Sequence, residues 1–82
     1  DWCIVRLARA GHVVGLDLDT SHFTGNYPPA ASIEACHLGS GDPDQDTHWF
    51  PLLPSVNLGG NRHHYFAVSS DRPCTHVRVN LY

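Results

Sequence analysis

The 82 residues include eight acidic side chains, five arginines and no lysine, so the formal net charge is −3 with neutral histidines. A chain of this length forms one compact unit or part of one, and it buries only about 60% of the surface that it exposes when unfolded. No basic stripe can neutralise phosphates and no apolar run reaches roughly 20 residues, so we expect neither a nucleic-acid nor a membrane partner.

Short alternating runs between clusters of turn-forming residues indicate antiparallel strands with one buried face, and therefore an all-β fold. The first predicted strand is Trp2 to Leu7. The second is His12 to Asp19, after an Ala10-Gly11 turn, and this spacing suggests that the two strands form a hairpin. The third predicted strand is Ser32 to Leu38.

The middle of the chain is expected to be a surface loop followed by an irregular segment. Residues Gly39 to Thr47 offer no apolar face and many turn formers. Three alternating aspartates in this loop resemble calcium ligands, but the EF-hand glycine and glutamate are missing, which favours a solvated acidic loop. His48 to Leu53 is expected to be a short edge strand or a packed loop, because Pro51 and Pro54 interrupt it.

The last two predicted strands are Tyr65 to Ser69 and Thr75 to Tyr82. Alternation along the final strand directs its valines and leucine inward and places a polar row on the other face, namely His76, Arg78, Asn80 and Tyr82. Arg78 offers a planar fork for a carboxylate, and His76 offers a proton carrier. A strand face that is simply exposed to water gives the same pattern.

Two carboxylates occupy one face of the second predicted strand. Asp17 and Asp19 lie about 7 Å apart on that face, while Leu16 and Leu18 point the other way. Such a pair can supply a general base or two metal ligands. The alternative is the solvated outer face of a half-buried sheet.

The segment from Thr20 to Pro29 is too long for a tight hairpin and rich in polar groups. Gly25-Asn26 suits a left-handed turn, and the prolines at its end stiffen the exit. The polar side chains that remain free to face a ligand are Thr20, His22, Thr24 and Asn26, although Thr20 can instead cap local backbone.

Three widely spaced cysteines, Cys3, Cys36 and Cys74, fit neither a closed set of disulfides nor a zinc knuckle. We therefore expect reduced, mostly buried thiols and a cytoplasmic location, with the peroxisome as the alternative. Adjacent His63 and His64 face opposite sides of a strand, so they cannot both bind one ion without a bulge.

Four blocks of this sequence resemble the allantoicase family: Asp1 to Leu7, Gly15 to Pro29, Ser32 to Ala35 and Thr75 to Asn80. The second block contains Asp-Thr-Ser-His-Phe-Thr-Gly-Asn-Tyr-Pro-Pro, which is long enough to be specific. The resemblance implies a jelly-roll β-sandwich of the galactose-binding-domain-like type. The complete repeat occurs twice in a full-length enzyme. Residues 1–82 would form one partial repeat that lacks the flanking strands.

Allantoicases hydrolyse allantoate to ureidoglycolate and urea in purine degradation, so the resemblance implies a hydrolase that acts on a carbon–nitrogen bond of a small-molecule substrate. It also implies a second repeat as a partner, and we expect a homo-oligomer. Because the repeat is incomplete, the isolated chain is expected to be inactive. The alternative is a non-catalytic ligand-binding or scaffold module on the same fold.

Allantoate has one carboxylate and two ureido arms, so its site needs a cation, amide-matching groups and a base for water. We assign Arg78 to the carboxylate, and Asp19 with His76 to proton transfer. His22 and Asn26, with Thr24 beside them, are assigned to the ureido groups. No cofactor is predicted; a divalent metal, if one activates the water, would take Asp19 and His22 as ligands.

Overall fold

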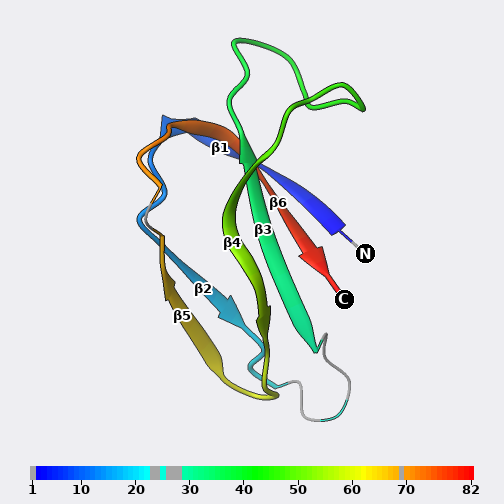
Figure 1. The fold of residues 1–82 in the computed structure, drawn as a ribbon. Coiled ribbons are helices and arrows are strands. Elements are labelled where there is room, and N and C mark those ends of the chain that lie inside the picture. Colours follow the sequence, from blue (N-terminus) through cyan, green and yellow to red (C-terminus); the bar gives the residue numbers. More distant parts are fainter. Residues whose placement is uncertain (1, 23–24, 26–28, 69) are drawn as a thin grey trace.

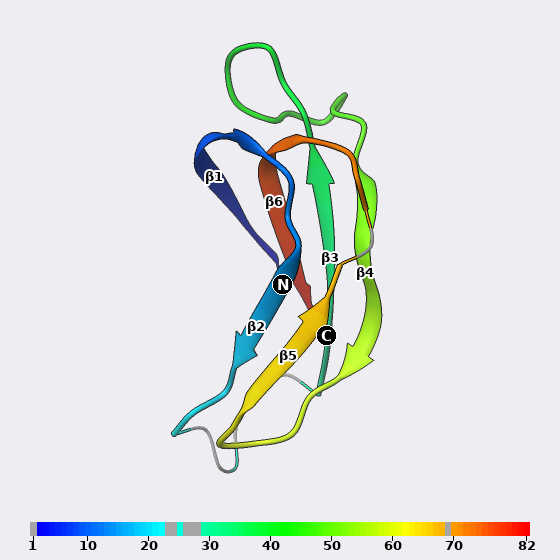
Figure 2. The ribbon, with the colours of Figure 1, turned by 90° about the vertical axis from the view of Figure 1, so that its left-hand side faces the viewer.

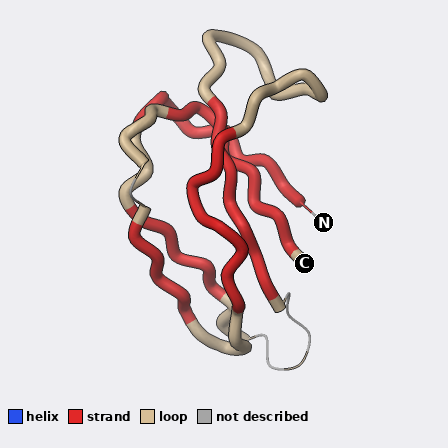
Figure 3. The backbone as a smooth tube through the Cα atoms, viewed as in Figure 1, coloured by secondary structure: helices blue, strands red, loops and turns tan. Residues whose placement is uncertain are grey.

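The computed structural model describes residues 2–22, 25, 29–68 and 70–82. Within these residues every regular element is a β-strand (Figure 3), which confirms the predicted all-β class. The strands are β1 (Trp2–Gly11), β2 (Gly15–Asp19), β3 (Ala30–Cys36), β4 (Phe50–Asn57), β5 (His63–Ala67) and β6 (Cys74–Leu81). The described part of the chain contains no helix that is long and apolar enough to cross a membrane.

The strands form two antiparallel sheets. One has four strands in the order β1-β6-β3-β4, and the other pairs β2 with β5. Figures 1 and 2 show the β2–β5 pair lying over one face of the four-stranded sheet, so the molecule is a β-sandwich with unequal layers.

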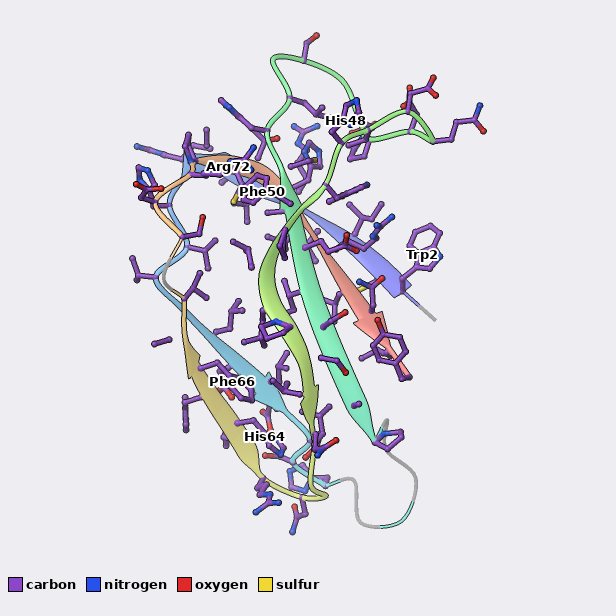
Figure 4. The ribbon with its side chains drawn as sticks, in the orientation of Figure 1. Trp2, His48, Phe50, His64, Phe66 and Arg72 are labelled. Carbon is purple, nitrogen blue, oxygen red and sulfur yellow. The ribbon has the colours of Figure 1, made fainter. Side chains whose placement is uncertain are left out.

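The core is centred on β3, which lies between β6 and β4. Its inward residues Ala31, Ile33 and Ala35 are at most 2% exposed, as strand alternation requires. Phe50 and Leu53 of β4 complete this face, and the Arg72 guanidinium covers the Phe50 ring at 3.8 Å (Figure 4). Few large side chains are fully buried, in keeping with the small size of the chain.

The predicted hairpin between the first two strands is wrong. β1 continues through Gly11 instead of turning at Ala10, and it pairs with β6, whereas β2 pairs with β5 in the other layer. The segment between β1 and β2 therefore crosses from one sheet to the other. The register of β1 against β6 is irregular between Arg6 and Gly11, where the strand leaves its regular pairing.

The edge-strand prediction for His48 to Leu53 is confirmed, although β4 begins at Phe50 and extends to Asn57. The predicted Gly39 to Thr47 loop lies between β3 and β4, and its three aspartates are exposed. The other strands lie one to four residues from their predicted bounds. β3 and β5 are shifted by two and β6 by one, β2 starts three residues late, and β1 ends four residues late.

Candidate functional site

The outward face of β2 and β5 carries two carboxylates and one imidazole, Asp17, Asp19 and His63, which we call the carboxylate–histidine cluster. Antiparallel pairing sets Asp19 opposite His63 and Asp17 opposite Tyr65. His63 Nδ1 lies 2.7 Å from Asp17 Oδ2, and its Nε2 lies 3.7 Å from Asp19 Oδ2. The imidazole of one strand thus bridges both carboxylates of the other.

The two carboxylates of this cluster stabilise the protonated form of its imidazole. The hydrogen bond to Asp17 raises the pKa of His63, and the negative charges of Asp17 and Asp19 add to that effect. Hydrogen bonds from Ser21 lower the pKa of Asp19, and the Ser21 N–H donates to Asp19 Oδ1 at 2.8 Å. Because the three side chains are 37 to 47% exposed, water screens these interactions.

The surface beside the cluster is a shallow depression lined in part by Asp17 and Tyr65. The Tyr65 ring stacks on His63, with ring centroids 5.6 Å apart and planes 5° from parallel. An imidazole oriented by a carboxylate can take a proton from water and return it to a leaving group. The face is open, so the described residues do not enclose a substrate there.

The segment that follows β2 is fixed against the loop before β5. Thr20 is 5% exposed; its Oγ1 donates to Gly59 O at 2.6 Å and its N–H donates to Arg62 O at 2.9 Å. The His22 N–H donates to Asn61 Oδ1 at 2.8 Å, and both residues have positive φ, 73° and 52°. Thr20 therefore bonds backbone, but that of the distant Gly59 and Arg62 and not the local backbone that the sequence suggested. The His22 side chain is exposed.

The loop before β5 also supplies a cation at this end of the sandwich. The Arg62 guanidinium lies over Gly59 so closely that a Cβ added there would collide with it. Arg62 directly precedes His63 in the chain, and its carbonyl accepts the Thr20 N–H. Arg62 thus places a positive charge over Gly59, in the loop that leads into His63.

The prediction that His63 and His64 face opposite sides of their strand is confirmed. His63 points outward, whereas His64 is partly buried at the lower end of the molecule (Figure 4). The His64 Nδ1 lies 2.7 Å from Leu18 O, and its Nε2 accepts the Gly59 N–H at 2.8 Å. Both ring nitrogens are used in holding β2 and the loop before β5, so His64 is structural.

The polar row predicted on the last strand shares the outer face of the four-stranded sheet. Glu34 Oε1 accepts from Arg78 Nη2 at 2.8 Å and from Asn80 Nδ2 at 2.9 Å, and these bonds lower the pKa of Glu34. The Arg78 guanidinium also lies 4.5 Å from the Trp49 ring centroid. The planar fork of Arg78 thus already holds a carboxylate of its own chain.

The structure does not bring together the predicted proton-transfer pair, Asp19 and His76. Asp19 ends β2, whereas His76 lies near the start of β6 in the other sheet, and Figure 1 places these strand ends at opposite ends of the molecule. Asp19 and Arg78 face outward from different layers, so they do not share a surface. Thr24 and Asn26 lie outside the described residues.

The residues near Asp19 that sequence reasoning missed are His63, Arg62 and Asn61. Their side chains or backbone reach Asp19, Thr20 and His22 only through the β2–β5 pairing. The available signal in the sequence was His63, an outward histidine at one end of a strand. The strand that pairs with it could not be identified from the sequence. Among the described residues, no group of three or more metal-ligating side chains is arranged to hold an ion.

Comparison with known proteins gives consistent results. A family model described as the allantoicase repeat matches residues 1–82. "Probable allantoicase 2" of Burkholderia pseudomallei is 60% identical over all 82 residues, and "Probable allantoicase" of Pseudomonas syringae pv. syringae is 52% identical. The chain spans about a quarter of the length of these relatives, 24% and 25%.

Two solved structures have the same fold. A structure titled "Structure of allantoicase" superposes with a TM-score of 0.90 at 27% identity, covering 99% of this chain and 28% of that one. The allantoicase crystal structure from Saccharomyces cerevisiae gives a TM-score of 0.81 at 22% identity, covering 98% of this chain and 23% of that one. The predicted β-sandwich is thereby confirmed.

Proposed function

Because this chain belongs to the allantoicase repeat family, we propose that the protein containing it hydrolyses allantoate to ureidoglycolate and urea. One observation carries the proposal above all: the repeat model matches the whole of residues 1–82. The carboxylate–histidine cluster adds a chemical reason, because the reaction needs a group that moves protons.

The products define the bond changes. Water oxygen bonds to the carbon that bears the carboxylate, the bond from that carbon to one ureido nitrogen breaks, and urea leaves. A base must take a proton from the water, and an acid must return a proton to the departing nitrogen. A single histidine can do both in turn if it faces both groups.

We assign proton transfer to His63, oriented by Asp17, with Asp19 stabilising the protonated ring. This keeps Asp19 in the site and replaces His76, because His63 lies 2.7 and 3.7 Å from the two carboxylates. Arg62 replaces Arg78 as the cation for the substrate carboxylate, since the Arg78 fork is bound to Glu34. The exposed His22 side chain is kept for a ureido group.

A second surface must close this site. The three cluster side chains are 37 to 47% exposed, and proton transfer is more effective where water is excluded. We assign that surface to a second repeat of the same protein or to another copy in a homo-oligomer. The isolated chain is therefore expected to be inactive.

The test is urea release from allantoate by the full-length protein and its variants. His63→Gln should lower kcat by about 10²- to 10⁴-fold, the range typical of a lost general acid–base group. Asp17→Asn should move the limb of the pH–rate profile set by His63 to lower pH, because the hydrogen bond that raises the pKa of His63 is lost. His12→Gln, at an exposed histidine outside the cluster, is the matched control.

The outcomes separate the function from the site. Absence of urea release by the unaltered protein contradicts the function itself. Urea release that is undiminished in a folded His63→Gln variant contradicts only the site assignment. Dialysis against EDTA tests the remaining alternative, since loss of activity that returns with a divalent ion assigns water activation to a metal.

A second candidate function is a non-catalytic sugar-binding module, favoured by one observation. A cavity of about 330 Å³ on the outer face of the four-stranded sheet is lined by Trp2 and Trp49, with Arg78 and Asp44 as polar groups. Aromatic walls with a few polar groups are typical of ligand pockets. Sugar binding that is lost in Trp49→Ala, by a protein that releases no urea from allantoate, would support this function.

A further inference from the structure

His76 is almost fully buried, yet one of its ring nitrogens is unpaired. The residue is 3% exposed, and Nε2 has no hydrogen-bond partner among the described residues. Leaving a buried polar group unpaired destabilises the fold. Such an atom in a native fold calls for an explanation, and a bound water or ion is one. Nε2 is itself closed off from solvent, so a bonding group from outside the chain reaches it only if a neighbouring side chain such as Asp42 moves aside.

We assign the ring proton to Nε2 from the neighbouring hydrogen bonds. The Leu38 N–H donates to Thr75 Oγ1 at 3.0 Å, so the hydroxyl accepts there and directs its own proton elsewhere. His76 Nδ1 lies 2.8 Å from Oγ1, whereas Cys36 O lies 3.4 Å away. The shorter contact favours donation to Nδ1, so the neutral ring carries its proton on Nε2. Nε2 is thus a donor without an acceptor.

His76 lines a cavity of about 290 Å³ formed by β1, the loop after β3 and the start of β6. Arg6, which is opposite His76 in the β1–β6 register, lines the same cavity, as do Arg9 and Ser40. The described residues that line it include no acidic side chain. The cavity therefore combines two permanent cations with a buried N–H donor.

Asp42 stands close to this cavity. Its Oδ1 is 3.9 Å from His76 Nε2, which is too long for a hydrogen bond, and its side chain is 81% exposed. The carboxylate is thus close enough to compete weakly for the same donor. An incoming anion would have to displace or repel it.

We propose that this cavity binds a small oxyanion, a carboxylate or a phosphate group, through His76 Nε2 and the guanidinium groups of Arg6 and Arg9. Guanidinium and imidazole N–H groups make short, charge-assisted bonds to both classes of oxyanion. The cavity is lined by β1, the loop after β3 and the start of β6. Figure 1 places the start of β6 at the end of the molecule away from the end of β2 and the start of β5, which carry Asp19 and His63. Binding of an oxyanion in this cavity does not depend on the proposed hydrolysis.

The experiment is calorimetric titration of the full-length protein with inorganic phosphate, and separately with acetate, in a buffer free of both anions. His76→Asn keeps an amide near the position of Nδ1 but removes the donor at Nε2, so it should weaken binding at least tenfold. His76→Gln restores a donor near Nε2 and should bind within about threefold of the unaltered protein. His48→Gln, at an exposed histidine outside the cavity, is the matched control.

Asp42→Asn supplies a test of opposite sign that leaves the buried ring untouched. Removing the competing carboxylate should strengthen anion binding severalfold, and this test remains valid if His76→Asn does not fold. Tighter binding of phosphate than of acetate would assign the site to phosphates, and the reverse to carboxylates. Equal binding by folded His76→Asn and the unaltered protein, or weaker binding by Asp42→Asn, would overturn the proposal.

Discussion

Replacing Thr20 with Val should detach the segment after β2 from the loop before β5. The two side chains have nearly the same shape, but Val removes the hydroxyl that donates to Gly59 O at 2.6 Å and accepts from the Arg62 N–H at 3.3 Å. One net hydrogen bond contributes about 1 kcal/mol, and a partly buried carbonyl left unpaired adds a similar cost. We therefore expect a loss of about 1–2 kcal/mol of unfolding free energy.

Urea denaturation followed by tryptophan fluorescence measures this loss. With a denaturant slope of about 1 kcal/mol per molar for a small unit, the midpoint should fall by about 1–2 M. Thr20→Ser is the matched control, because it keeps the hydroxyl and loses only a methyl group. If Thr20→Val unfolds at the same urea concentration as Thr20→Ser, the hydroxyl does not anchor this segment and the reasoning is wrong.

Three further predictions concern the core and the two charged clusters. Ile33→Ala should destabilise the protein by about 2–5 kcal/mol in thermal or chemical unfolding, because the side chain is 2% exposed at the centre of β3. Asp17→Asn should lower the pKa of His63, as measured by NMR titration of the ring. In the unaltered protein the raised pKa stabilises the fold below about pH 6.5, and this contribution is lost as the pH rises through the pKa of His63 in the folded state. The lowered pKa of Glu34 stabilises the fold above about pH 4.3, and this contribution is lost in stronger acid. Glu34→Gln should remove the contribution, so that the free energy of unfolding depends less on pH in that range.

Alternation along single strands could be predicted from the sequence, because the side-chain period of a strand is a local property. It correctly placed Asp17 with Asp19, Arg78 with Asn80, and His63 opposite to His64. The confirmed all-β class and the surface loop between β3 and β4 also follow from local composition.

Pairing between strands could not be predicted in the same way. The residues from Trp2 to Asp19 do not indicate that β1 pairs with β6 and β2 with β5, because those partner strands lie more than 40 residues away in the sequence. The wrong hairpin also explains why His63 was not placed beside Asp19, since His63 reaches Asp19 only through β5. The family resemblance identified the segment after β2 but not the loop that fixes it.

The sheet order also gives the molecule two unlike borders. β4, at one border of the four-stranded sheet, lacks backbone N–H groups at Pro51 and Pro54, so another strand would find an incomplete ladder there. β1, at the opposite border, has ten residues and no proline. Any β-strand addition to this sheet is consequently directional: a neighbouring repeat or copy would extend it beside β1, and growth beside β4 is disfavoured.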